Sequence, residues 1–333
     1  MEEKQKNSSS YLECMTANER MEMAKGQPMP LSLFDGFWVR GELTILFANT
    51  GIGKTILAVQ IADSIAKGEP IEGFDMEVEA QPVLYADFEL TDKQFEMRYA
   101  EQLGEGKNKQ LVNHYQFHDN FTILRPNKDR LAEEGVDGGL ISALEEKVVE
   151  TGAKVLVVDN ISYIKDSQEK TNEALTLMKR LNMLKMKHGL SILVLGHTPK
   201  RDKERGLTDD DLAGSKMLGN FTDAMFAIGK NSEDGSGRVY LKQVLVRSAE
   251  HKYSADNVIV CSIEKTNNFI KFVKEDMATE SSILKMVTDE EQRLIEERVV
   301  MLHEEHNMSL RKIAADVGWN KNKVQRFLQR RAA

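Results

Sequence analysis

One short segment constrains the fold of this 333-residue chain more than any other. Residues 48–55 read Ala-Asn-Thr-Gly-Ile-Gly-Lys-Thr, and they follow the apolar run 43–47. After them, residues 56–65 place apolar side chains at helical spacing, and Gly68 ends the pattern. An order of strand, glycine-bearing turn and helix leaves backbone N–H groups and the positive end of the helix dipole facing one point, which stabilises a phosphate. The segment therefore predicts a phosphate-binding loop.

The residue types of this loop predict ATP and Mg²⁺ as its ligands. Lys54 is placed to reach the β- and γ-phosphates, and the Thr55 hydroxyl is placed to hold Mg²⁺. The other members would contribute backbone N–H groups, and they are Ala48, Asn49, Thr50, Gly51, Ile52 and Gly53. Ala48 stands where the common pattern has glycine, so the backbone there must take an angle that a Cβ tolerates. A chance glycine turn is the alternative, and the flanking strand and helix argue against it.

Acidic residues after two further apolar runs are candidates for the chemistry. Asp159 ends the run 155–158 and would complete the Mg²⁺ site, whereas the alternative is an Asp that only caps the following turn. Glu89 follows the run 83–86 and is our candidate for orienting or deprotonating the attacking water, with Asp87 as the second choice. A solvated surface acid is the competing interpretation of Glu89.

The order of apolar runs and helical patterns predicts an α/β fold. Buried strands are expected at 43–47, 83–86, 155–158 and 192–195, and helices at 56–65, 91–103, 140–149 and 171–187. Apolar strands that alternate with helices imply a mostly parallel sheet covered on both faces. Beyond Phe221 the strands follow closely, at 224–228, 239–246, 258–263 and 269–273. These strands favour an antiparallel extension of a P-loop NTPase core, followed by a small all-α unit.

Changes in composition divide the chain into four parts. The parts are a flexible leader (1–28), an ATPase domain (29–275), a polar linker (276–287) and a helix-turn-helix unit (288–333). No uncharged apolar run reaches the ~18 residues that a membrane span needs. Cys14 and Cys261 lack the spacing of a disulfide framework or of a thiolate metal site. We therefore expect a cytoplasmic protein with no membrane partner.

The C-terminal unit has the pattern of a DNA-binding helix-turn-helix. Ser309 is expected to cap one helix, Gly318 to make the turn and Asn320 to cap a second helix. Residues 309–333 carry seven Lys or Arg against one acid, although the whole chain has a net charge of −8. The residues predicted to face duplex DNA are Lys321, Asn322, Lys323 and Gln325. A three-helix module that contacts protein is the alternative.

Four segments, taken in order, resemble the RecA-like ATPases and most closely the plasmid RepA-type hexameric replicative helicases, which are relatives of the DnaB helicases. The segments are Gly41-Glu42-Leu43-Thr44-Ile45-Leu46, Asp87-Phe88-Glu89-Leu90, Val157-Val158-Asp159-Asn160 and Gly196-His197-Thr198-Pro199-Lys200. The resemblance covers residues 28–273. It implies that Glu89 is the catalytic glutamate and that His197 senses the γ-phosphate and couples it to DNA-binding loops.

The same resemblance implies a homo-oligomeric ring, usually of six subunits, in which a basic residue of one subunit completes the active site of its neighbour. Lys242 and Arg247 are the nearest matches to that residue. The stretch between His197 and Phe221 corresponds to a central loop that touches single-stranded DNA. The contacting residues would be Lys200, Arg201 and Lys216. No aromatic residue is interleaved with these charges, so contact with the DNA backbone is favoured over base stacking.

These features predict an ATP-hydrolysing, DNA-dependent motor, most simply a ring-forming replicative helicase of a plasmid or another mobile element. Two other functions would use the same phosphate loop. One is an ATP-switched DNA-binding regulator or helicase loader that unwinds nothing, and the other is a recombinase that forms filaments.

Overall fold

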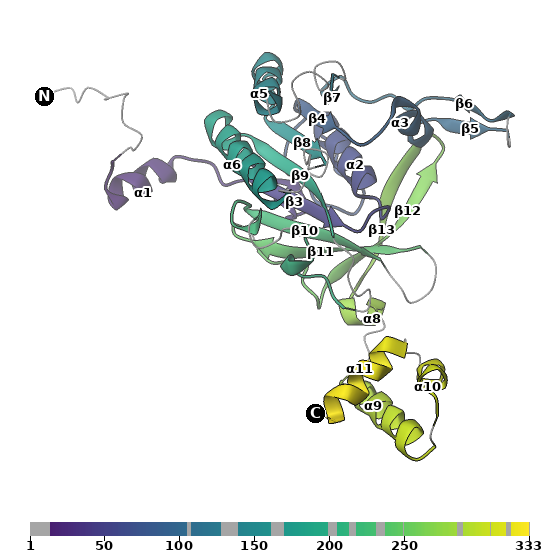
Figure 1. Ribbon diagram of the computed structural model, residues 1–333. Coiled ribbons are helices and arrows are strands. Elements are labelled where there is room, and N and C mark those ends of the chain that lie inside the picture. The colour runs from purple at the N-terminus through teal and green to yellow at the C-terminus, as the bar shows by residue number, and fades with distance from the viewer. Residues whose placement is uncertain are drawn as a thin grey trace, which may run out of the picture.

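The computed structural model of the chain describes residues 14–104, 108–127, 139–160, 170–198, 205–212, 218–230, 237–248, 250–284, 289–306, 308–317 and 321–332. In this part of the chain, nine strands form one sheet in the order β13-β12-β11-β10-β3-β9-β8-β4-β7 (Figure 1). The strands are β3 (Leu43–Ala48), β4 (Val83–Asp87), β7 (Phe121–Leu124), β8 (Val155–Asp159), β9 (Ser191–His197), β10 (Ala224–Lys230), β11 (Val239–Val246), β12 (Val258–Thr266) and β13 (Phe269–Ala278). Every predicted strand is present, and β7 is an addition to the prediction.

The central strands of the parallel part of the sheet are buried on both faces. Strands β10, β3, β9, β8, β4 and β7 all run in one direction. Every residue of β3, β4 and β8 is buried, which explains why these strands are continuous apolar runs without alternation. The predicted α/β class with a mostly parallel sheet is therefore confirmed.

Helices cover the two faces of this sheet separately (Figure 1). α2 (Lys54–Lys67) packs on one face in a core cluster that also includes residues of β1 (Ser32–Phe34) and β2 (Trp38–Val39), which pair with each other. α5 (Leu140–Thr151) and α6 (Lys170–His188) contribute to the core cluster on the other face. α2 starts shortly after the carboxyl end of β3, so the phosphate loop between them lies at the edge of the sheet where the parallel strands end.

The antiparallel part of the sheet begins one strand later than the sequence predicts. The run 224–228 was expected in the antiparallel extension, but β10 pairs parallel with β3, with Ala224 opposite Thr44. The other edge of β10 pairs antiparallel with β11, and β12 and β13 continue that pattern. An apolar run indicates a buried strand without indicating the direction in which it enters the sheet.

The helix expected at 91–103 is shorter than predicted. α3 spans Asp92–Arg98, and β5 (Glu101–Leu103) then pairs antiparallel with β6 (Gln110–Val112). Tyr99, the residue after α3, is buried in an aromatic cluster. Its ring neighbours are Phe95, Phe117 and Phe269. Tertiary packing of this ring overrides the helical spacing of the local sequence.

The predicted leader and linker both contain helical residues. α1 (Ala17–Lys25) opens with a capping box of Thr16 and Glu19 and buries none of its residues. β13 continues to Ala278, and α8 (Glu280–Leu284) packs Ile283 and Leu284 into the same core cluster as α5 and α6. These residues of the predicted linker are therefore part of the packed structure.

Three helices at the C-terminal end share a small core of their own. They are α9 (Asp289–Glu304), α10 (Leu310–Asp316) and α11 (Lys321–Ala332). The fully packed members of this core are Val299, Leu302, Ile313, Ala314 and Val324. An all-α C-terminal unit is thus present. Among the described helices, none has both the length and the apolar character that crossing a membrane requires.

Candidate active site

The phosphate loop follows a backbone path that needs its glycines. Gly51 and Gly53 have φ angles of 80° and 102°, in the left-handed region. A Cβ on Gly53 would also lie 2.8 Å from Ile263 Cδ1, so a larger residue is excluded there for two reasons. Ala48, in contrast, is the last residue of β3 and keeps the extended backbone of that strand. This position therefore tolerates the Cβ that distinguishes it from the common glycine.

Lys54 begins α2 and holds its ammonium group against the loop. Its Nζ lies 3.2 Å from the Ala48 carbonyl oxygen and 3.0 Å from His197 Nδ1. Burial lowers the pKa of Lys54, and the carboxylates of Glu89 and Asp159 oppose that shift. A polyphosphate at the loop would add negative charge and favour the ammonium form. The position and charge of Lys54 are therefore suited to binding a polyphosphate.

Asp159 is a fully buried carboxylate at the end of β8. Its Oδ2 accepts a hydrogen bond from the Tyr85 hydroxyl at 2.7 Å. Burial raises the pKa of Asp159 to about 6, and the carboxylates of Glu89 and Asp87 add to this shift, while the hydroxyls of Thr55 and Tyr85 oppose it. The Thr55 hydroxyl is near enough to lower the pKa of Asp159. Even so, no described residue donates a hydrogen bond of normal geometry to Asp159 Oδ1.

The orphaned oxygen of Asp159 fits a hard cation. A buried carboxylate oxygen without a partner is unfavourable unless a ligand completes it. Among the described residues, no cluster of three or more His, Cys, Asp or Glu side chains could hold a metal alone. Mg²⁺ is usually bound by one or two protein oxygens together with substrate phosphates. Thr55 and Asp159 would therefore hold Mg²⁺, whose chemistry is to neutralise charge on the phosphates.

Asp87 and Glu89, at the end of β4 and in the turn after it, differ in burial and in their contacts. Asp87 is buried, and its Oδ1 accepts hydrogen bonds from the backbone N–H groups of Glu89 at 3.0 Å and Leu90 at 2.9 Å. Asp87 therefore closes the turn. The Glu89 side chain is exposed, and its Oε2 accepts a hydrogen bond from Asn160 Nδ2 at 2.5 Å. Of the two candidates, Glu89 has the accessible carboxylate.

Asn160 and His197 connect Glu89 to the phosphate loop. Asn160 Nδ2 lies 3.1 Å from His197 Nε2, and His197 Nδ1 lies 3.0 Å from Lys54 Nζ. The series Glu89, Asn160, His197 and Lys54 thus crosses the ends of four neighbouring elements, β4, β8, β9 and α2. The sequence prediction gave no role to Asn160. The signal available was a polar residue directly after the Asp that ends a buried strand.

Comparison with protein families decides the class of this site. The family described as the AAA domain matches residues 12–203. The chain belongs to the AAA domain family. The matched range contains the phosphate loop, Glu89, Asp159 and His197, so the residues that the structure brings together all fall inside the AAA domain. The prediction of a nucleotide-hydrolysing P-loop domain is confirmed at this level, and its ligand is ATP.

Comparison with solved structures supports a RecA-like fold for this AAA-domain chain. The KaiC-like protein PH0186 of the hyperthermophilic archaeon Pyrococcus horikoshii OT3 matches with a TM-score of 0.50 and 15% sequence identity. The match covers 72% of this chain and 93% of that protein. Comparison with curated proteins gives no match. The finer resemblance to RepA-type helicases stays a prediction.

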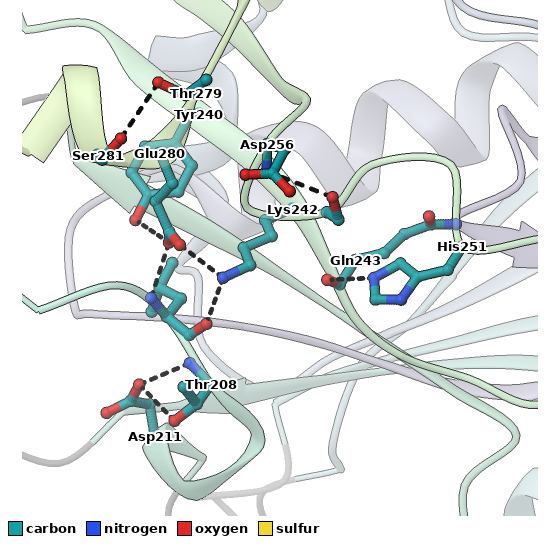
Figure 2. Close-up of polar contacts among 12 residues, drawn as sticks. Thr208, Asp211, Tyr240, Lys242, Gln243, His251, Asp256, Thr279, Glu280 and Ser281 are labelled. Atoms are coloured by element: carbon teal, nitrogen blue, oxygen red, sulfur yellow. Dashed lines mark hydrogen bonds and ion pairs between the residues drawn. The ribbon is translucent and has the colours of Figure 1, made fainter.

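Lys242, one of two residues expected to act in a neighbouring subunit, is paired within its own chain (Figure 2). Its Nζ donates to Glu280 Oε2 at 2.6 Å and to the Leu207 carbonyl at 2.7 Å. Glu280 Oε1 also accepts from the Tyr240 hydroxyl at 2.8 Å and the Leu207 N–H at 2.7 Å. The Lys242 and Glu280 side chains are only 12% and 4% exposed. The ion pair of Lys242 with Glu280 therefore connects β11 to α8.

Arg247 differs from Lys242 because it is exposed. It follows β11, and its Nη2 donates to the Gly219 carbonyl at 3.1 Å. Between these two residues, Arg247 is the accessible candidate for a role in a neighbouring subunit, which stays a prediction.

The predicted DNA contacts lie in two places. Lys200, Arg201 and Lys216 fall outside the described residues. Lys321 begins α11 and is exposed, as is Gln325, whereas the buried Val324 anchors the helix in the C-terminal core. Asn322 and Lys323 are on the same helix, but their side chains are outside the described part of the structure.

Replacement of Asn160 by Ala tests its contact with Glu89. We expect the kcat for ATP hydrolysis to fall about 10²-fold, the low end of what a positioned general base contributes. Nucleotide affinity should not change, because Lys54 and Thr55 remain. Asn120→Ala is the matched control, since Asn120 is a half-buried amide that donates to the Ala66 carbonyl away from the site. A wild-type kcat in Asn160→Ala would contradict the assignment.

Asp159→Asn should stabilise the protein without Mg²⁺ while removing Mg²⁺-dependent nucleotide binding. The pKa of Asp159 rises from 3.8 to about 6 on folding, so its contribution to stability is complete below about pH 4 and is lost as the pH rises through about 6. At ~1.4 kcal/mol per pKa unit, the variant should gain up to about 3 kcal/mol above that range. Urea unfolding in EDTA measures this gain, and a pH-independent difference would contradict the assignment.

Proposed function

We propose that this chain is an ATP-hydrolysing, DNA-dependent motor that forms a ring and acts as a replicative helicase of a plasmid or another mobile element. The position of His197 is the observation that carries the proposal. Its ring lies beside Lys54 and Asn160 in the ATP site, and it is the last residue of β9. The chain then enters the segment that holds Lys200 and Arg201. A response of His197 to the γ-phosphate would therefore act on the start of a DNA-contacting loop.

In this proposal, each step of ATP hydrolysis is assigned to a described residue. Lys54 and the N–H groups of the loop would bind the phosphates, and Thr55 and Asp159 would hold Mg²⁺, which would neutralise charge on the phosphates. Glu89 would orient the attacking water and accept its proton while the bond from the water oxygen to the γ-phosphorus forms and the bond from that phosphorus to the bridging oxygen breaks, with ADP as the leaving group. Asn160 holds Glu89 in place for this step. His197, beside Lys54 and Asn160, would sense the departure of the γ-phosphate.

Basic residues in two regions support DNA as the partner. The first region lies between the end of β9 and β10, and its residues Lys200, Arg201 and Lys216 are among five Lys or Arg that stand beside five Asp or Glu in residues 198–221. The second is α11, where Lys321 and Gln325 are exposed and Arg330 and Arg331 occupy the last turn. Because Lys and Arg release counterions from DNA phosphates, these side chains favour contact with a polyanion, most clearly in α11, which contains no acidic residue, despite the net charge of −8 for the whole chain.

An ATP-switched DNA-binding regulator or helicase loader is the second candidate. The separate core of α9, α10 and α11 favours it, because a self-contained helical unit whose last helix is basic is suited to recruitment at a duplex site. Both candidates use the same ATP site, so they differ only in whether hydrolysis is coupled to strand separation.

Strand displacement on a forked DNA substrate tests the motor. We expect ATP-dependent unwinding by the wild type and none by Lys54→Ala, because the loop then loses its phosphate-binding cation. Lys147→Ala is the matched control and should unwind normally, because the Lys147 side chain on α5 is 44% exposed and pairs with Glu150. DNA-stimulated hydrolysis without any strand displacement would contradict the helicase and favour the loader.

Mixing two inactive variants tests the ring and the role of Arg247. Lys54→Ala and Arg247→Ala should each lose ATPase activity when alone. In a ring of randomly mixed subunits at equal amounts, about a quarter of the sites would combine Lys54 from one subunit with Arg247 from its neighbour. We therefore expect mixing to restore about a quarter of wild-type activity. Lack of any recovery would contradict a shared site. Lys242→Ala is unsuitable here, since it would leave Glu280 buried without its cation.

A further inference from the structure

A hydroxyl from a neighbouring strand holds the carboxylate of Asp159. Tyr85 on β4 pairs with Val157 of β8, two residues before Asp159. Because alternate residues of a strand share a face, Asp159 lies on the same face as Val157. Tyr85 and Val157 both belong to the core cluster beneath α2. The Tyr85 side chain therefore reaches diagonally across the two strands, where its hydroxyl donates to Asp159 Oδ2 at 2.7 Å.

This hydrogen bond is enclosed by protein. Tyr85 is 1% exposed and Asp159 is 0% exposed. The Tyr85 ring also packs edge-on against Phe121, with 5.9 Å between ring centroids, which fixes the direction of the hydroxyl. Hydrogen bonds to an ionised group are strong in such surroundings, because no water competes for the carboxylate. The bond from Tyr85 therefore determines that Oδ2 is the Asp159 oxygen engaged within the protein.

The other oxygen of Asp159 remains for a cation. Oδ1 is buried and has no hydrogen-bond partner among the described residues. The Thr55 hydroxyl, at the start of α2, is close enough to act on the carboxylate. Rotation of the carboxylate would exchange its two oxygens, but it would first have to break the bond from Tyr85. Residues that orient metal ligands in this way usually matter to affinity almost as much as the ligands do.

We infer that Tyr85 is a positioning residue of the metal site, which fixes Asp159 so that Oδ1 faces Mg²⁺ beside the Thr55 hydroxyl. The inference rests on the ATPase part of the proposed function and needs neither DNA binding nor a ring. It assigns Tyr85 no contact with ATP. Loss of its hydroxyl should therefore affect the Mg²⁺-dependent part of nucleotide binding and leave the Mg²⁺-independent part unchanged.

A second buried tyrosine offers a matched control. Tyr99 is 3% exposed and belongs to the same core cluster as Tyr85. Its hydroxyl is buried and has no hydrogen-bond partner among the described residues. Tyr85→Phe and Tyr99→Phe each remove one buried hydroxyl and retain the ring. Only the first removes a contact with Asp159, so general effects of the substitution are separated from the proposed one.

The experiment measures binding of a fluorescent ATP analogue to the full chain, first in EDTA and then with increasing Mg²⁺. For Tyr85→Phe we expect the Mg²⁺ concentration at half-maximal tightening to rise about tenfold to a hundredfold, as for other residues that orient metal ligands. Affinity in EDTA should equal that of the wild type. Tyr99→Phe should match the wild type in both measurements. Circular dichroism melting of each variant checks that it folds.

The outcomes distinguish the inference from the proposed function. A wild type that binds with Mg²⁺ dependence, together with an unchanged Tyr85→Phe, would overturn the inference alone. Equal shifts in both tyrosine variants would overturn it too, because the effect would then come from packing. A wild type without any Mg²⁺-dependent binding would overturn both the inference and the proposed function. If Tyr85→Phe does not fold, the same titration is made with Tyr85→Leu, which is smaller and has no hydrogen-bond donor, and unchanged Mg²⁺ dependence in that variant overturns the inference.

Discussion

The burial of one negative charge organises the ATP site of this chain. Asp159 lies at the end of a central parallel strand, fully buried, with one oxygen bonded to Tyr85 and the other without a partner among the described residues. Such a group is unfavourable by itself, and nearby acids raise its pKa further. Lys54 and a divalent cation are the natural counter-charges. Burial of the Asp159 carboxylate is therefore unfavourable in free energy, and binding of nucleotide and metal would offset this.

The order of the strands brings these charges together. β3, β9, β8 and β4 are neighbours in one parallel sheet, so their carboxyl ends share an edge. Asp159 and His197 are the last residues of their strands, Lys54 and Glu89 come shortly after theirs, and the four meet at this edge although they are far apart in the sequence. Open parallel sheets generally bind ligands at this edge. The antiparallel strands lie beyond β10, where β12 and β13 pack Ile263 and Phe272 against Gly53.

Local signals in the sequence were enough to predict much of this arrangement. The phosphate loop, Asp159 and Glu89 each follow an apolar run that is a buried strand, so their positions could be predicted without long-range information. The parallel direction of β10 could not be predicted, because an apolar run does not indicate whether its strand enters the sheet parallel or antiparallel. The roles of Asn160 and Tyr85 depend on contacts across strands, and the pairing of Lys242 with Glu280 joins residues of β11 and α8. The pattern of apolar and polar residues along the sequence does not predict such contacts.

A crystal structure with a non-hydrolysable ATP analogue and Mg²⁺ would test the central claim most directly. The account predicts phosphates in the loop at 48–55, Mg²⁺ beside the Thr55 hydroxyl and on the Oδ1 side of Asp159, and the γ-phosphate next to Lys54 and His197. The Tyr85 hydroxyl should still bond to Asp159 Oδ2. A nucleotide bound away from the loop, or a metal that has neither Thr55 nor Asp159 in its coordination shells, would contradict the account.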